Sequence, residues 1–351
     1  MKALSLNVAK FQPARCICYL SMIWFVSLCL SSLPSCNIFR LEEELADDPE
    51  SVFEYLWNDV KIKYSYFELK SIDWDSIHLK YRPAIHRNTN ALELFDILSE
   101  MLFELKDGHV NLTSVFDRSR NWEWFQDYPS NFNINNVERN YLGKDFRITG
   151  PFRHTFLDTL LYIYYPSFAL TITDSHIDVL HAFARVSKGI ILDIRDNGGG
   201  NLGNARRLAS LFSSNEIEYG MERLKNGPGI NDFSEWKKIT FPGRGANTYS
   251  GPVILLTNRK CFSAATFFTL MMQTLPQVKI LGDQTGGGGG IPGFGELPNG
   301  WQYRCSVSQT VSLDGIHIES GILPDIRMDL LNEDEVKGID TYIEKAIELL
   351  Q

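Results

Sequence analysis

Cysteine is scarce in this chain, and long apolar runs are missing beyond its first few dozen residues. Three of the six cysteines fall within the first 30 residues and another is Cys36, so Cys261 and Cys305 are too few for a disulfide framework and their pairing stays open. Cysteine and histidine never recur at the spacing of zinc ligands, so we expect no metal. No segment after Leu33 reaches the ~20 apolar residues of a membrane-spanning helix.

Positive charge is also in short supply. The formal net charge is -9, and residues 1–35 contain three basic residues and no acid, so removing them would take the charge to -12. This balance argues against nucleic acid and anionic lipid as partners. The hydrophobic and charged fractions, 44% and 22%, are ordinary for a globular protein.

The N-terminus has the pattern of a secretory signal. Basic residues precede an apolar stretch over residues 16–33. The stretch ends in Leu33-Pro34-Ser35-Cys36, which resembles the cleavage box of bacterial lipoproteins, where the cysteine becomes acylated. We therefore predict a signal peptide over 1–35, a lipid on Cys36 and a location in the cell envelope, at the outer membrane or periplasmic face. The alternative is a single N-terminal membrane anchor.

The rest of the chain predicts helices first, and then strands that alternate with helices. Residues 113–150 are polar and poorly periodic, and we expect loops and short edge strands there. The later alternation is typical of an α/β sheet with parallel strands. Predicted helices cover 52–60, 91–105, 174–186, 205–212, the segment after Ser263 and 339–350, and predicted strands cover 162–165, 189–194, 253–257 and 278–281, with a hairpin over 301–313.

Ser263 lies where the predicted strand 253–257 leads into an apolar helix. A serine at such a junction lies near free backbone N–H groups, which a nucleophile that forms an oxyanion requires. Its hydroxyl must also be activated by a neighbouring base. Serine is equally a favoured helix N-cap, so this segment alone leaves a purely structural role open.

His109 is the leading candidate for that base. It follows Gly108 just past the predicted helix 91–105, and the glycine suits a helix C-cap. Among the other histidines only His317, two residues before Glu319, is a serious competitor. A carboxylate such as Glu319 can hold a catalytic histidine in the right tautomer, although it could equally be a solvated charge.

Two glycine-rich segments follow predicted strands. The turn Asp193–Gly200 ends a buried strand, where open α/β sheets bind their ligands, and glycine lets an N–H approach an oxyanion. It matches the dinucleotide pattern only weakly, because charged residues crowd the strand end. The run Thr285–Gly290 lacks the Lys-Ser or Lys-Thr of a phosphate loop, so we expect a mobile or closely packed loop beside the site and no organic cofactor.

Taken together, these segments resemble the C-terminal-processing and tricorn-type serine peptidases. The resemblance rests on the ordered segments LKDGHV, DIRDNGGG, NRKCFSAAT, GDQTGGGGG and IESGILPDI, and it covers about half of the chain. It implies an α/β core of the ClpP/crotonase type preceded by a helical N-terminal domain. We therefore expect a helical domain over 36–115, connecting loops and edge strands over 116–160, and the catalytic core with a C-terminal helix over 161–351.

The resemblance also implies the roles of individual residues. The nucleophile falls on Ser263, the base on His109 and the orienting carboxylate on Glu319, as in the tricorn branch. The oxyanion donors fall on the backbone N–H groups of Ala264 and Gly199.

The chain departs from the family pattern at three places. The processing branch uses a lysine base, but its position is occupied here by Gly288, which excludes a Ser-Lys dyad there. The serine that precedes the histidine in tricorn is Gly108 here, so a four-residue relay is incomplete. Only about 50 residues separate His109 from the strand at Tyr162, and they do not resemble the PDZ domain that processing peptidases carry.

The expected function is therefore that of a serine peptidase without metal or cofactor. Its substrate would be a peptide or an unfolded protein, and its N-terminal lipid would bind a membrane, while the oligomeric state stays open. Two alternatives are compatible with the same residues: a non-catalytic ligand-binding protein on this fold, and an esterase or amidase.

Overall fold

The computed structural model describes residues 46–121 and 123–351. The predicted signal peptide over 1–35 and the predicted lipid site Cys36 lie outside the described residues and stay predictions. The described part of the chain belongs to one unit, Ala46–Gln351. Within that part, every helix is too short or too polar to cross a membrane.

The largest sheet has seven strands in the order β13-β9-β8-β5-β4-β3-β2. Neighbours from β13 to β4 run parallel, and β4-β3-β2 run antiparallel. The prediction of an α/β sheet with parallel strands is thus confirmed. The strands are β2 (Arg147–Thr149), β3 (Phe152–Leu157), β4 (Leu160–Tyr164), β5 (Gly189–Asp193), β8 (Val253–Thr257), β9 (Val278–Gly282) and β13 (Ile326–Arg327).

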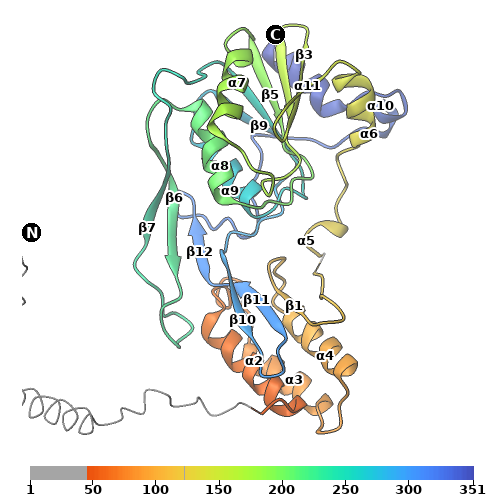
Figure 1. Ribbon diagram of the computed structural model, residues 1–351, viewed down its shortest axis with the longest axis vertical. Helices are drawn as coiled ribbons and strands as arrows, with labels where there is room; N and C mark the ends of the chain where they lie inside the picture. Colours follow the sequence, from red (N-terminus) through yellow and green to blue (C-terminus); the bar gives the residue numbers. More distant parts are fainter. Residues whose placement is uncertain (1–45, 122) are drawn as a thin grey trace, which may run out of the picture. The chain divides into compact units, whose positions relative to one another are not determined.

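Helices cover both faces of this sheet (Figure 1). On β5, Leu192 packs in an apolar cluster with α7, α8 and α9, whereas its neighbour Ile191 packs in a second cluster with α11. Since successive strand residues point to opposite faces, the strands must be apolar throughout, as the sequence shows. The helices are α6 (Ile134–Val137), η2 (Glu138–Leu142), α7 (Asp174–Ala184), α8 (Leu202–Ala209), η3 (Ser210–Phe212), α9 (Ala264–Gln273), α10 (Asn332–Val336) and α11 (Thr341–Leu350).

The N-terminal helices pack against a separate three-stranded sheet of order β1-β11-β10 (Figure 1). One apolar cluster contains Leu56 of α2, Leu98 of α4, Leu112 of β1 and Tyr303 of β11. Segments about 190 residues apart in the sequence therefore share one core. The elements are α2 (Pro49–Lys63), α3 (Trp74–Tyr81), η1 (Arg82–Ala84), α4 (Ala91–Phe103), β1 (Asn111–Thr113), α5 (Glu123–Gln126), β10 (Pro292–Glu296) and β11 (Gln302–Ser306).

A third sheet has the order β12-β6-β7, from β6 (Ile217–Leu224), β7 (Lys237–Phe241) and β12 (Ser308–Val311). The predicted hairpin over 301–313 is wrong, because β11 pairs with β1 and β10 whereas β12 pairs with β6. Both segments are strands, as the sequence pattern indicated. Their partners come from other parts of the chain, so the segment links two sheets.

The carboxyl ends of the neighbouring strands β5 and β8 bring together the segments that carry the predicted chemistry. The turn after β5 bonds the loop after β8, through Phe262 N to Asn197 O at 3.1 Å. The glycine run closes over the same loop, because Gly286 N donates to Cys261 O at 2.7 Å and Ser263 N donates to Gly287 O at 2.8 Å. Of the two expectations for this run, close packing is the one observed.

Candidate active site

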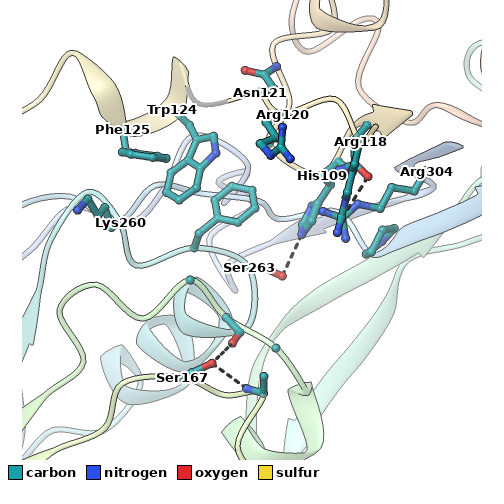
Figure 2. A pocket seen from close by; sticks show the side chains of 18 of the residues that line it. His109, Arg118, Arg120, Asn121, Trp124, Phe125, Ser167, Lys260, Ser263 and Arg304 are labelled. Carbon is teal, nitrogen blue, oxygen red and sulfur yellow. Dashed lines mark hydrogen bonds between the residues drawn. The ribbon is translucent and has the colours of Figure 1, made fainter. Parts of the chain in front are cut away.

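Ser263 has a backbone conformation that costs free energy for any residue other than glycine. It immediately precedes α9, with φ of 54° and ψ of -119°. The side chain makes no hydrogen bond to the first turn of α9, so the helix-cap interpretation is wrong. Strain of this kind is of order 1–3 kcal/mol and is typical of functional sites, where it directs a side chain toward its target. The hydroxyl points toward His109 (Figure 2).

His109 lies between α4 and β1, where Asp107 fixes its backbone. The Asp107 carboxylate accepts the His109 N–H at 2.8 Å, and the imidazole packs against the ring of Phe262 with centroids 4.8 Å apart. The His109 Nε2 atom lies 2.9 Å from Ser263 Oγ. The structure thus brings together the two side chains that the motifs suggested. Gly108 is not the helix C-cap that was predicted, because Glu104 caps α4.

Burial controls the charge of the imidazole. Removing the ring from water lowers the pKa of His109 to about 4, although the nearby Asp107 carboxylate opposes the shift. The ring is therefore neutral near pH 7, and its Nε2 can accept the Ser263 hydroxyl proton. The other ring nitrogen, Nδ1, is buried and has no hydrogen-bond partner among the described residues.

Asp107 is the carboxylate nearest to Nδ1, at 4.0 Å. Its other oxygen accepts the Ser306 hydroxyl at 2.8 Å and lies 4.0 Å from the Lys70 ammonium. Although burial favours the neutral acid, Lys70 and His109 hold the pKa of Asp107 below its ordinary value. Asp107 therefore keeps a negative charge beside the imidazole.

Glu319 belongs to the same cluster through its contact with Lys70. Its carboxylate accepts the Lys70 ammonium at 2.7 Å and the Gly289 N–H at 2.9 Å, and no contact with His109 is found among the described residues. Burial, reinforced by the charge of Asp107, raises the pKa of Glu319 to about 7. No direct contact in the described part of the chain supports the prediction that Glu319 orients His109, and the carboxylate found within 4.0 Å of Nδ1 is that of Asp107.

The sequence analysis did not predict Asp107 and Lys70, and the sequence contains a local signal for only one of them. Asp107 lies within the LKDGHV segment, two residues before the histidine, so its proximity was open to inference. Lys70 stands in an aromatic-rich stretch 249 positions before its partner Glu319, and nothing in the pattern distinguishes it from a surface lysine.

The two predicted oxyanion donors both lie beside Ser263 but differ in their hydrogen bonding. Ala264 is the first residue of α9, so its N–H has no acceptor within the helix. The Gly199 N–H donates to the side chain of Asn197 at 3.0 Å. Gly199 must be glycine, because its φ is +92° and a Cβ would lie 2.5 Å from the Phe262 carbonyl oxygen and 2.9 Å from Ser263 Cβ.

Two further glycines explain the departures from the family pattern. Gly288 has a φ of +77°, and a Cβ there would lie 2.6 Å from the Phe262 ring. A Cβ on Gly108 would lie 2.6 Å from Trp124 and 2.8 Å from the same phenylalanine ring. The stacked Phe262 and Trp124 rings, 4.3 Å apart, thus occupy the space that a lysine base or a relay serine would need.

A cavity of about 750 Å³ opens onto Ser263 and His109. Figure 2 shows aromatic side chains on one side and cationic side chains around His109. The lining includes Arg118, Arg120, Asn121, Trp124, Phe125, Ser167, Gly199, Lys260, Phe262 and Arg304. Such a mixture of apolar walls and a few polar groups is typical of ligand-binding pockets.

Other candidate residues lie elsewhere. His317, the competing base, packs near Trp236 and Tyr66 rather than against Ser263. Cys261 and Cys305 are both buried and unpaired, which answers the question of their pairing. Across the described ranges, no group of three or more histidine, cysteine, aspartate or glutamate side chains is arranged to hold a metal ion.

Comparisons with known proteins agree with this architecture. Residues 159–328 match the model of peptidase family S41, and residues 45–103 match the Tricorn protease C1 domain. A peptidase crystal structure from Parabacteroides merdae is 41% identical, covers 87% of this chain and 97% of that one, and superimposes with a TM-score of 0.83. Mature CPAF bound to lactacystin shares the fold, with a TM-score of 0.65 and 12% identity over 86% of this chain and 98% of that one.

Among curated proteins, the carboxy-terminal processing protease CtpA of Bacillus subtilis is 26% identical over 146 residues. The match spans 41% of this chain and only 29% of that protein.

The mixed sheet, with Ser263 in the loop after β8 and His109 2.9 Å from its hydroxyl, defines the class, that of serine hydrolases with an α/β core. Within this class, the chain belongs to peptidase family S41.

Proposed function

We propose that this protein is an active serine peptidase in which Ser263 is the nucleophile and His109 is the general base. The observation that carries the proposal is the 2.9 Å contact between Ser263 Oγ and His109 Nε2. Two supporting features are the strained serine backbone and an imidazole that is neutral near pH 7. A helix cap or a simple ligand-binding wall would need neither.

In the proposed reaction, His109 Nε2 accepts the hydroxyl proton while Ser263 Oγ attacks the carbonyl carbon of the peptide bond. The Ala264 N–H donates to the developing oxyanion. The Gly199 N–H is the second donor, and it must turn from the Asn197 side chain toward the substrate to serve. His109 then protonates the leaving amine, and water releases the acyl group from Ser263.

The carboxylates have different roles in this proposal. Asp107 stabilises the imidazolium that forms during the reaction, because its negative charge lies 4.0 Å from Nδ1. Glu319 is a positioning residue, which acts through Lys70 by holding the ammonium between two carboxylates. The serine, histidine and glutamate thus form one connected cluster, in which Asp107 and Lys70 complete the link.

Peptide turnover tests this function. Ser263→Ala and His109→Ala should each lower kcat on an unstructured polypeptide by about 10⁴-fold. The matched controls Ser250→Ala and His86→Ala change exposed residues outside the cavity and should leave kcat unchanged. Full activity in either site variant would refute the assignment.

The two alternative functions are separated by substrate choice. A ligand-binding protein would turn over neither peptides nor esters. An esterase or amidase would hydrolyse nitrophenyl esters while leaving casein and unstructured peptides intact. The cavity of about 750 Å³, lined by the stacked rings of Trp124 and Phe262, is large enough for a polypeptide segment and favours such a substrate.

We also propose that the protein is exported and anchored through a lipid on Cys36, at the outer membrane or on the periplasmic side. The support is the N-terminal sequence, with its basic start, apolar stretch and cysteine after a small residue. Incorporation of labelled fatty acid into the full chain, and its loss in Cys36→Ser, would support the anchor. Incorporation that persists in Cys36→Ser would contradict it.

A further inference from the structure

Two arginines that line the cavity, Arg118 and Arg304, make no ion pair with any of the described residues. Arg304 on β11 is half-buried, and its Nε atom is buried without a hydrogen-bond partner among the described residues. The only side-chain hydrogen bond of Arg118 in the described part of the chain is a long one, 3.4 Å to Asn111 Oδ1. Burial, and then the charge of Arg118, lower the pKa of Arg304. The two guanidinium groups are therefore close enough to repel each other, and the charge of Asp107 opposes this effect at Arg304 only in part.

The other cationic side chains that line the cavity, Arg120 and Lys260, do make ion pairs. Arg120 pairs with Asp117 at 3.5 Å, and Lys260 pairs with Asp196 at 3.3 Å. For Arg118 and Arg304, no ion pair is found within the residues that the structure describes. Partly desolvated like charges are costly unless an anion joins them, so this pair is suited to an anionic ligand.

The fold holds both arginines in fixed places. Arg304 lies opposite Asn111 in the β1–β11 pairing. Arg118 forms an antiparallel bridge with Thr113, which ends β1. Two short strand connections thus tie the arginines to the segment that also carries His109.

This arrangement puts the arginines on the leaving-group side of the scissile bond. The base that protonates the leaving amine must lie next to it, so the residues after the scissile bond pass His109. Arg118 and Arg304 lie near His109, whereas Ser167 lies on the other side of Ser263 (Figure 2). The charge of Arg304 contributes to the lowered pKa of His109, which agrees with its proximity.

We propose that Arg118 and Arg304 bind a carboxylate of the substrate just after the scissile bond. The carboxylate belongs either to an aspartate or glutamate side chain or to the free C-terminus of a substrate cut near its end. Guanidinium groups bind carboxylates through paired, charge-assisted hydrogen bonds, which supply both orientation and affinity. This inference rests on the proposed peptidase function, whose site it extends.

The test compares three peptides of one sequence. The first has glutamate in the first or second position after the cleaved bond. The second has glutamine there and an amidated C-terminus, and the third has glutamine and a free C-terminus close to that bond. The wild-type protein should cleave at least one carboxylate-bearing peptide about 10- to 100-fold faster in kcat/KM than the amidated glutamine peptide. The glutamate and free-terminus arms distinguish the two sources of the carboxylate. Equal rates on all three would overturn the subsite.

The variants R118Q and R304Q should each remove this preference, so that the carboxylate-bearing peptides and the neutral peptide are cleaved with similar kcat/KM. R118E supplies a gain-of-function readout, because it should shift preference to a peptide with lysine at the same position, which a misfolded protein cannot do. R185Q changes an exposed arginine that follows directly after α7, outside the cavity, and should keep the wild-type preference. A carboxylate preference that survives in both R118Q and R304Q would refute the role of these arginines.

These outcomes stay separate from those of the proposed function. If the neutral peptide is cleaved and Ser263→Ala abolishes its cleavage, the peptidase function stands even when no carboxylate preference is found. The opposite result has two parts: the wild-type protein cleaves none of the peptides, and no acyl donor reacts with Ser263. In that case the proposed function and the subsite both fail.

Discussion

Replacing Asp107 by asparagine tests which carboxylate supports His109. The substitution keeps the shape of the side chain and the oxygen that accepts the His109 N–H, removes the charge, and replaces the oxygen that accepts the Ser306 hydroxyl by an amide nitrogen. That charge lies 4.0 Å from Nδ1. At an effective dielectric constant of about 20, two unit charges at this distance interact by about 4 kcal/mol.

Lys70 reduces this value, because its ammonium lies 4.0 Å from the same carboxylate. We therefore expect the transition state, which contains an imidazolium, to lose about 2–4 kcal/mol in Asp107→Asn. The corresponding loss in kcat/KM is roughly 30- to 1000-fold. The pKa of His109 should fall further, since a negative charge that favours the protonated ring is gone.

Glu319→Gln is the informative comparison. Glu319 contacts Lys70 rather than His109, and with a pKa of about 7 it is partly protonated at neutral pH. Its replacement should cost less than about tenfold in kcat/KM. The exposed Asp314→Asn serves as a control for the loss of one negative charge and should behave as wild type.

The assay is kcat/KM on an unstructured peptide between pH 4 and pH 8, with thermal unfolding of each variant recorded in parallel. Asp107→Asn should lose far more activity than Glu319→Gln while remaining folded. The reverse order, with Glu319→Gln the more damaging of two equally stable variants, would refute the assignment of Asp107 and restore Glu319 as the residue that supports the imidazole.

Three further predictions follow from burial and steric contacts. Catalysis needs neutral His109, whose pKa is about 4, so kcat/KM should rise with pH through about 4 and stay level to pH 8. A pH-rate profile in which kcat/KM falls off below about pH 6.5 would contradict this. Gly288→Lys should lower activity at least tenfold and lower the melting temperature, because φ at this position is +77° and the Phe262 ring fills the space of the side chain. The new lysine should not act as a base, and a peptidase with the alkaline pH profile of a lysine base would be the contrary result. Burial raises the pKa of the Cys261 and Cys305 thiols, so neither should react with a thiol reagent until the chain unfolds, and fast labelling of folded protein would count against their burial.

The order of the motifs was enough to predict the centre of the site. Ser263 and His109 are 154 positions apart, yet the strand-to-helix junction and the segment after α4 each pointed to one of them. The parallel strands were also predictable, since their apolar runs are bounded by clear turn residues. Such signals are local, so a single sequence carries them.

Long-range pairing was not predictable in the same way. The segment over 301–313 has the pattern of two strands, but only the folded chain shows that β11 joins β1 and β12 joins β6. Lys70 becomes part of the site only because α2 and the following turn pack against β11. Glu319 contacts Lys70 instead of His109, and no residue pattern marks a lysine 249 positions away as its partner.

The most direct test of the central claim is covalent labelling with a fluorophosphonate followed by peptide mapping. The wild-type protein should acquire one adduct, on Ser263, and His109→Ala, shown to be folded by its melting curve, should react at least about 10³-fold more slowly. An adduct at another residue, or equal labelling rates for wild type and His109→Ala, would contradict the pairing of Ser263 with His109.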